Sequence, residues 1–149
     1  MKTTQRNAVT VTGDPNGQPM MFSHGFGCDQ NMWRFVWPAF ADAYQIVLFD
    51  HVGSGGSDLS AYSFCRTDPD IAAKFARATF LADNRGDLRR LRTPALIMQC
   101  SDDVIAPSVV GAYVHRHAAG STLVSMNATG HCPNLSAPEE TVAVIKGYL

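Results

Sequence analysis

Short apolar runs bounded by turn-forming residues recur along this chain of 149 residues, and they constrain its fold more than any other feature. They cover 19–23, 45–49, 94–100 and 122–126, and a more alternating first strand covers 7–13. Runs of roughly four to eight apolar residues are typical of strands buried on both faces of a parallel sheet. Apolar spacings of three and four predict helices over 30–44, 68–82, 107–120 and 136–149. This alternation predicts an α/β fold, with a mostly parallel sheet flanked by helices.

Individual residue types indicate where these helices begin and break. Asp68 followed by Pro69 is typical of a helix start. Pro38 is expected to kink or interrupt the first helix, because proline has no backbone N–H to donate. Ser136 followed by Glu139 predicts a capping box for the last helix.

Composition indicates one globular domain over residues 1–149. Hydrophobic residues make up 46% and charged residues 17%, and the formal net charge is −1. The short basic cluster 89–92 is interpreted as a solvated helix end, so we expect no nucleic-acid partner. No apolar run reaches the roughly 20 residues of a membrane span, and the N-terminus lacks the apolar core of a signal peptide. The four cysteines form no C-x-x-C pair, which favours free thiols, no metal or other cofactor, and a cytoplasmic location.

An acid and a histidine follow two of the expected strands in the order that acid–base catalysis on this kind of sheet requires. Asp102 and Asp103 follow the strand 94–100, and His131 follows the strand 122–126. A carboxylate can hold an imidazole in the tautomer that takes a proton from a nucleophile. Asp102 could instead be a solvated neighbour or a helix cap.

Three segments together resemble the RsbQ-like α/β-hydrolases, a family to which the plant strigolactone and karrikin receptors are similar. The segments are 22–30 (FSHGFGCDQ), 49–62 (FDHVGSGGSDLSAY) and 99–107 (QCSDDVIAP), and the resemblance extends from about residue 7 to residue 149. It implies that Asp103 is the triad acid and His131 the triad base. It also implies that the backbone N–H of Phe26 belongs to an oxyanion hole, where Gly25 permits close approach and Cys28 lies beside the turn.

The chain departs from this family after Tyr62. No G-x-S-x-G nucleophile elbow occurs anywhere in the sequence, and the family's next strand and helical lid are also missing. Residues 63–69 instead resemble the helix beyond the lid. The expected architecture is therefore a truncated, lidless α/β-hydrolase fold.

Ser54 is the first candidate to replace the missing nucleophile. It lies among Gly53, Gly55 and Gly56 after the strand 45–49, and small neighbours permit the strained, exposed turn of an elbow. The alternative is that this loop is the family's ordinary noncatalytic loop. Weaker candidates are Ser57, the thiols of Cys28 and Cys132, and a metal-activated water held by His24, Asp50, His51, Asp103 and His131. Ser23 is interpreted as a strand-end residue.

These features predict a small carboxyl-ester hydrolase of modest, promiscuous activity on short apolar esters. The alternative is a noncatalytic ligand-binding or regulatory protein derived from a hydrolase, because the loss of a triad serine removes most catalysis while leaving binding groups in place. With central strands missing, unpaired sheet edges predict a homodimer or a swapped oligomer.

Overall fold

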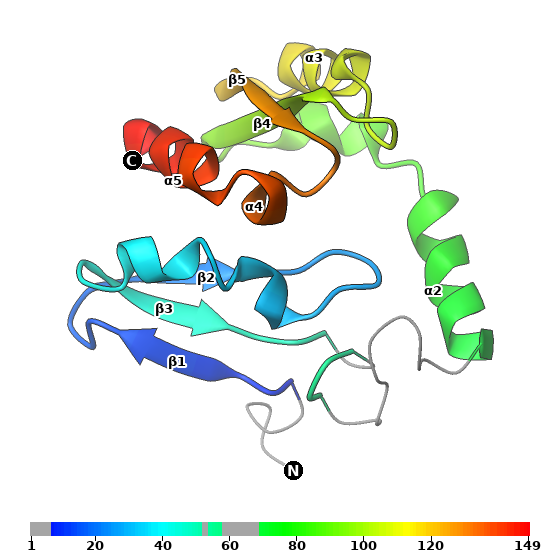
Figure 1. Cartoon of the computed structure of the whole chain (residues 1–149). Coiled ribbons are helices and arrows are strands. Elements are labelled where there is room, and N and C mark those ends of the chain that lie inside the picture. The colour runs from blue at the N-terminus through cyan, green and yellow to red at the C-terminus, as the bar shows by residue number, and fades with distance from the viewer. Residues whose placement is uncertain (1–6, 52–53, 58–68) are drawn as a thin grey trace. The chain divides into compact units, whose positions relative to one another are not determined.

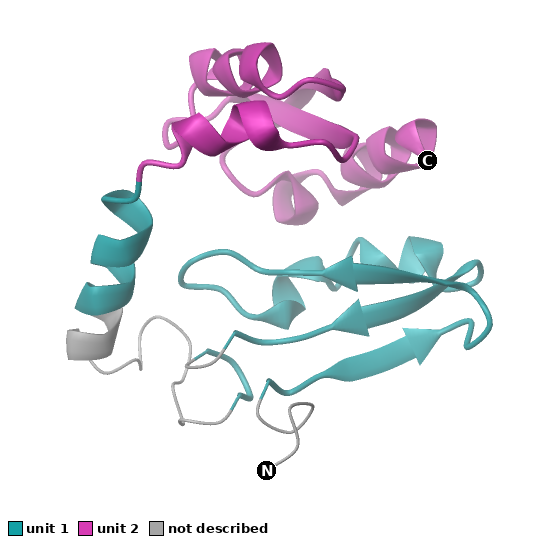
Figure 2. Ribbon diagram, turned by 180° about the vertical axis from the view of Figure 1, so that it is seen from behind, with its two compact units in different colours: residues 1–82 teal, residues 83–149 magenta. Residues whose placement is uncertain are grey.

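The computed structural model describes residues 7–51, 54–57 and 69–149, which group into two compact units, 1–82 and 83–149 (Figure 2). Each unit has its own sheet, and each is described separately below. The single-domain organisation stays a prediction. Asp68, the expected helix cap, lies outside the described residues.

Unit 1 contains a three-stranded sheet in the order β1-β3-β2 (Figure 1). Strand β2 (Gln18–Phe22) runs parallel to β3 (Tyr44–Leu48), and β1 (Thr10–Gly13) runs antiparallel to β3. The tight turn after β1 does not make a hairpin, because β1 and β2 both pair with β3 and not with each other. The buried hydrophobic residues of this unit are Phe22, Val36, Phe40, Ile46 and Leu48.

The connection from β2 to β3 corrects the expectation of one helix over 30–44. It consists of two single-turn 3-10 helices, η1 (Gln30–Trp33) and η2 (Trp37–Phe40). Asp29 caps η1 by accepting from the N–H of Asn31 at 2.8 Å. Pro38 lies in the first turn of η2, where its missing N–H costs nothing but where it cannot continue a helix from before. The apolar spacing was correct in that Val36 and Phe40 are buried.

Helix α2 (Pro69–Phe80) completes unit 1. The ring of Phe26, in the turn after β2, stacks on Phe75 with a centroid distance of 5.4 Å. It also meets Phe80 edge-on at 5.7 Å. Aromatic contacts of this kind contribute beyond the area they bury, so they link the turn after β2 to this helix.

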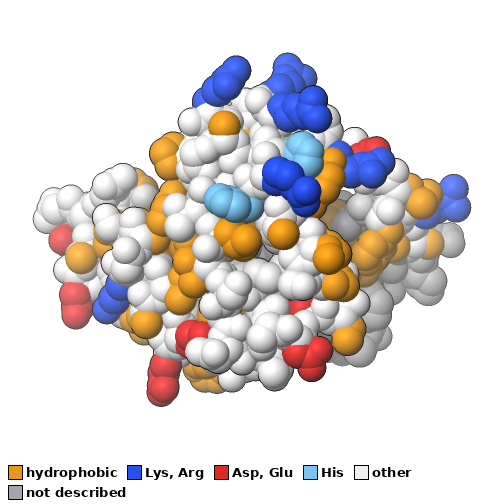
Figure 3. All heavy atoms as spheres, turned by 90° about the horizontal axis from the view of Figure 1, so that it is seen from above, with side chains coloured by type: hydrophobic (Ala, Val, Ile, Leu, Met, Phe, Trp, Pro, Cys, Tyr) orange, Lys and Arg blue, Asp and Glu red, His pale blue; other side chains and the backbone are white. Residues whose placement is uncertain are grey.

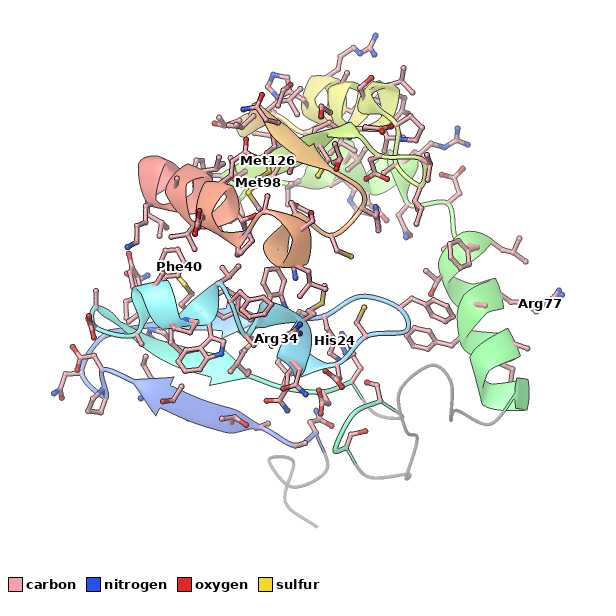
Figure 4. All side chains as sticks on the ribbon, viewed as in Figure 1. His24, Arg34, Phe40, Arg77, Met98 and Met126 are labelled. Atoms are coloured by element: carbon pink, nitrogen blue, oxygen red, sulfur yellow. The ribbon has the colours of Figure 1, made fainter. Side chains whose placement is uncertain are left out.

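Unit 2 is built on two parallel strands, β4 (Ala95–Asp102) and β5 (Ser121–Thr129), with a register irregularity between Cys100 and Asp102. Its helices are η4 (Arg85–Arg90), α3 (Ser108–His117), α4 (Pro133–Ser136) and α5 (Pro138–Tyr148). Met126 belongs to a buried cluster with Cys100 and Ala128, against which Met98 packs (Figure 4). The parallel β4–β5 pair agrees with the sequence-based expectation.

Two polar side chains, buried Gln99 and half-buried Glu140, link the strands of unit 2 to its helices. Gln99, on β4, donates to the carbonyl of Ala106 at 2.9 Å and accepts from the N–H of Gly111 on α3 at 3.1 Å. Glu140, on α5, accepts from two backbone N–H groups of β5 at 2.7 and 3.0 Å. These bonds fix the helices against the sheet in a way that apolar packing alone does not.

The expected capping box is wrong. The Ser136 hydroxyl donates to the carbonyls of Thr129 and Cys132, at 3.1 and 3.4 Å, and so does not cap α5. Helix α5 begins after Ala137 without a side-chain cap. The basic cluster 89–92 is exposed, with its first two residues in the last turn of η4, as expected of a solvated helix end. In Figure 3, Lys and Arg side chains project as separate groups with uncharged atoms between them.

Candidate active site

Asp103 and His131 come together at the carboxyl ends of β4 and β5. Because the two strands are parallel neighbours, the loops that follow them leave the sheet at the same edge. The N–H of Gly130, which has a φ of +81°, donates to the carbonyl of Asp102 at 2.7 Å and joins the two loops. His131 Nδ1 then lies 2.9 Å from Asp103 Oδ2.

The surroundings of Asp103 favour its ionised form. Its Oδ1 accepts from the N–H groups of Ala106 and Ile105, both at 2.9 Å. The N–H of Ala106 foremost, then the hydrogen bond from His131 and the N–H of Ile105, hold the pKa of Asp103 below its usual range, against the opposing effect of burial. An ionised carboxylate only accepts hydrogen bonds, so the proton of His131 is on Nδ1.

His131 therefore presents Nε2 as a proton acceptor. Its side chain is 48% exposed, whereas that of Asp103 is 6% exposed. A buried acid that orients an accessible imidazole is the arrangement that a general base requires. The structure brings these two residues together as the sequence predicted. Their catalytic roles belong to the proposal below.

The turn after β2 contains Gly25, Phe26 and Cys28, which the resemblance assigned to an oxyanion hole. The N–H of Cys28 donates to the carbonyl of Gly25 at 3.3 Å, and Gly27 has a φ of +75°. These features make a tight turn at the carboxyl end of β2. Since the N–H of Cys28 is used within the turn, the Cys28 backbone is not available to a substrate oxygen in this conformation. The role of Phe26 stays a prediction.

Ser54 contacts an imidazole that the sequence did not predict for it. Its hydroxyl lies 2.8 Å from the carbonyl of His51, to which it can only donate, and 3.1 Å from His24 Nε2. The same Nε2 accepts from the N–H of His51 at 3.0 Å, and Nδ1 of His24 donates to the carbonyl of Gly25 at 2.9 Å. Buried His24 is therefore the neutral Nδ1–H tautomer and holds the ends of β2 and β3 together.

Asp50, which follows β3, organises the same loop. It is 2% exposed, and its carboxylate accepts from the N–H of Gln30 at 2.8 Å, from the N–H of Gly56 at 2.8 Å and from the side-chain amide of Gln30 at 3.1 Å. From the sequence, Asp50 was expected only as a metal ligand, and its role in holding the loop was not predicted. Its position between a strand and a glycine-rich loop could have indicated that role.

A cavity of about 580 Å³ opens beside Asp50 in unit 1. Its lining residues are Thr10, Asp29, Gln30, Asn31, Arg34, Trp37, Leu48, Asp50, Gly55 and Gly56. Figure 4 labels Arg34 and His24 in this unit. Every lining residue belongs to unit 1, whereas Asp103 and His131 belong to unit 2.

The remaining nucleophile candidates differ in their surroundings. Ser57 is buried, and its hydroxyl accepts from the N–H of Ser54 at 3.1 Å. Cys28 and Cys132 are half-buried thiols. Cys100 is buried, and burial raises the pKa of its thiol, which makes this cysteine a poor nucleophile.

Over residues 7–51, 54–57 and 69–149, no three His, Cys, Asp or Glu side chains are grouped to hold a metal ion. Over the same residues, no helix is long and apolar enough to cross a membrane.

A comparison with known families assigns the chain to one of them. The model of the Alpha/beta hydrolase family matches residues 63–144, more than half of the chain. The chain belongs to the alpha/beta hydrolase family, and the expected fold class is confirmed.

Particular relatives support the same assignment. The chain is 36% identical to the Karrikin insensitive 2 receptor IA of Petunia hybrida over 103 residues, which are 66% of this chain and 38% of that protein. It is 37% identical to the Pimeloyl-[acyl-carrier protein] methyl ester esterase of Neisseria meningitidis over 100 residues, which are 67% of this chain and 39% of that protein. The matches thus span under two fifths of either relative.

Among solved structures, the hydrolase olei00960 from Oleispira antarctica matches with a TM-score of 0.90 and 22% identity, covering 97% of this chain and 95% of that chain. At this identity the match supports the fold alone.

Proposed function

We propose that the protein hydrolyses carboxyl esters, with His131 as the proton acceptor and Asp103 as the acid that orients it. The 2.9 Å contact between His131 Nδ1 and Asp103 Oδ2 is the observation that carries this proposal, because it turns Nδ1 toward the acid and leaves Nε2 as the ring nitrogen that can accept a proton. A relative that is itself named an esterase adds support.

In the proposed reaction, His131 Nε2 takes a proton from a serine hydroxyl or from water as the oxygen attacks the ester carbonyl. The bond from the carbonyl carbon to the alkoxy oxygen breaks, and the alkoxide takes that proton and leaves as an alcohol. With a serine, water then attacks the acyl-serine, His131 takes the proton of the water and returns it to the serine oxygen, and the acid is released. Ser54 is the first candidate for the serine. The N–H of Phe26 would stabilise the oxyanion, with Gly25 allowing close approach and Cys28 beside the turn. Without a lid, we expect a poorly selective site for short apolar esters.

The decisive experiment compares hydrolysis of p-nitrophenyl acetate by the wild type and by His131→Ala. Loss of a general base should lower the rate about 100-fold or more. His115→Ala is the matched control, because His115 is also an exposed histidine of unit 2, bonded at Nδ1 to a hydroxyl and not to a carboxylate. Circular dichroism should show all three proteins equally folded.

Equal rates for the wild type and His131→Ala would reject the proposed base. A chain that is also unreactive to a fluorophosphonate, yet thermally stabilised by a small apolar ligand, would be a noncatalytic binder instead.

We also propose that the protein is a cytoplasmic homodimer or swapped oligomer. The thiols of Cys100 and Cys132, which form no disulfide among the described residues, support a reducing compartment. Strands β2 and β4 each have one strand neighbour among the described residues, and such edges can pair with another chain.

A further inference from the structure

Unit 1 holds a second serine–histidine pair, Ser23 and His51, that the proposed function does not use. Ser23 follows β2 and His51 lies just after β3, and these strands are parallel neighbours whose last residues, Phe22 and Leu48, are paired. Both side chains therefore reach the same edge of the sheet. Ser23 Oγ lies 3.1 Å from His51 Nε2, within the range expected between a nucleophile and its base.

Ser23 is better placed than Ser54 to react with an electrophile. Ser23 is exposed, and His51 is half-buried. Among the described residues, the hydroxyl of Ser23 has the His51 ring as its one hydrogen-bond partner. The Ser54 hydroxyl instead donates to a carbonyl at 2.8 Å, and the imidazole beside it, His24, is buried and already accepts a backbone N–H.

Neighbouring groups hold both members of the Ser23–His51 pair in place. The His51 ring meets the rings of His24 and Phe49 edge-on, at centroid distances of 4.6 and 5.3 Å. The N–H of His51 is bonded to His24 Nε2. The serine of the pair is held by Trp33, whose indole N–H donates to the backbone carbonyl of Ser23 at 3.0 Å. Packing and backbone bonds thus orient the pair, and among the described residues no carboxylate bonds to the His51 ring.

We propose that Ser23 is a nucleophilic site that ester and fluorophosphonate electrophiles modify, with His51 as its proton acceptor. With an ester, Ser23 Oγ forms a bond to the carbonyl carbon while its proton moves to His51 Nε2. The bond from that carbon to the alkoxy oxygen then breaks, and the alkoxide takes the proton and leaves as an alcohol. The products are an acyl-serine at Ser23 and one molecule of alcohol. This site rests on contacts within unit 1 and does not depend on the role of His131.

The test treats the full-length protein with a fluorophosphonate probe and locates the adduct by peptide mass spectrometry. We expect the label on Ser23, its loss in Ser23→Ala, and its retention in Ser121→Ala, the matched control, because Ser121 also lies beside a histidine, at 2.9 Å from His115 Nδ1. His51→Gln keeps a polar side chain but cannot accept the proton in the same way, so labelling should slow at least tenfold.

A label on Ser54, a label elsewhere or no label on the wild type would overturn the proposal. An unchanged rate in His51→Gln would also overturn it. Because the adduct is mapped on the wild type, the result stands even where Ser23→Ala folds poorly. His131→Ala separates the two proposals, since it should keep Ser23 labelling even though we expect it to lose ester hydrolysis.

Discussion

Two aspartates shape loops in the same way, one in each unit. Asp50 accepts the N–H groups of Gln30 and Gly56, and Asp103 accepts those of Ile105 and Ala106. A carboxylate that accepts several N–H bonds is stabilised in its ionised form and fixes the backbone that donates them. Each aspartate also lies beside a histidine: His51 follows Asp50 in the same loop, and His131 bonds to Asp103 from the loop after β5.

Gly55 should be intolerant of substitution, because it has a φ of +52° and a Cβ there would overlap the Asp50 carboxylate. We predict that Gly55→Ala lowers the free energy of unfolding by about 1–3 kcal/mol, measured by urea denaturation. Gly56→Ala is the matched control: its Cβ would meet Ala8 Cβ at 3.5 Å and Asp50 Oδ2 at 3.8 Å, both ordinary contacts. A denaturation midpoint for Gly55→Ala equal to that of the wild type would refute this account of the loop.

Asp103 should make stability dependent on pH in the acid range. Its pKa is lowered in the folded state, so its contribution is complete above the unfolded pKa of about 3.9 and is lost as pH falls through the folded value. We predict that Asp103→Asn has a lower thermal midpoint than the wild type at pH 7, and that the gap narrows below about pH 4. Thermal melts across that range measure it; a gap independent of pH would show that ionisation is not the cause.

At the scale of elements, Gln99 connects the strand that leads to Asp103 with the helix that follows. Its amide donates to the carbonyl of Ala106, whose own N–H donates to Asp103, and it accepts from the N–H of Gly111. The side chain is buried, so these bonds have no water to replace them. The loop that carries Asp103 is therefore held at two points, by the Asp103 carboxylate and by the Gln99 side chain on β4.

We predict that Gln99→Met costs about 1–3 kcal/mol of unfolding free energy, because it leaves buried backbone groups unpaired. It should also lower ester hydrolysis, since the Asp103 loop loses one of its supports. Gln45→Met is the control, because Gln45 is half-buried on a strand and donates only a long 3.5 Å bond to Pro15. Chemical denaturation and p-nitrophenyl acetate assays measure both effects, and equal losses in the two variants would contradict the prediction.

The strands were predictable from sequence because each contains a short apolar run near turn-forming residues, as in residues 95–98 of β4, although these four residues are half-buried and not buried on both faces. The pairing of Asp103 with His131 followed from their order after parallel strands. The segment 30–44 was mispredicted because apolar spacing does not distinguish an α-helix from two short 3-10 turns separated at Pro38. The capping box failed because Ser136 found nearer backbone carbonyls. Local patterns do not encode such competition for hydrogen-bond partners.

The histidines of unit 1 show the other limit. Ser54 with His24 and Ser23 with His51 are about 30 residues apart in sequence, at 30 and 28 residues respectively. Their contacts depend on the parallel pairing of β2 with β3, and no short motif contains both members. They could have been found only by assuming that register first and then asking which polar side chains follow the two strands.

At the scale of the whole molecule, each sheet has edge strands, which pair with one strand neighbour among the described residues. They are β1 and β2 in unit 1 and β4 and β5 in unit 2. Met21, on β2, is 66% exposed. Exposed apolar residues on an unprotected edge favour pairing with another chain, whereas a lysine there opposes it.

We predict that Met21→Lys weakens self-association, measured as a lower weight-average mass by sedimentation at micromolar concentration. Val11→Lys is the matched control, because Val11 is an equally apolar, 58% exposed residue on β1, the opposite edge of the same sheet. A wild type that sediments as a monomer would show that the protein does not self-associate. Equal effects of the two lysine substitutions would show that self-association does not depend on the β2 edge in particular.

The bonds described here that hold the Asp103–His131 pair come from residues 99–131. Such a pair is held within one continuous segment of unit 2, so a change of sequence before residue 83 leaves these bonds in place. An acid–base pair of this construction can outlast the loss of a lid or an elbow and be matched afterwards with a different nucleophile.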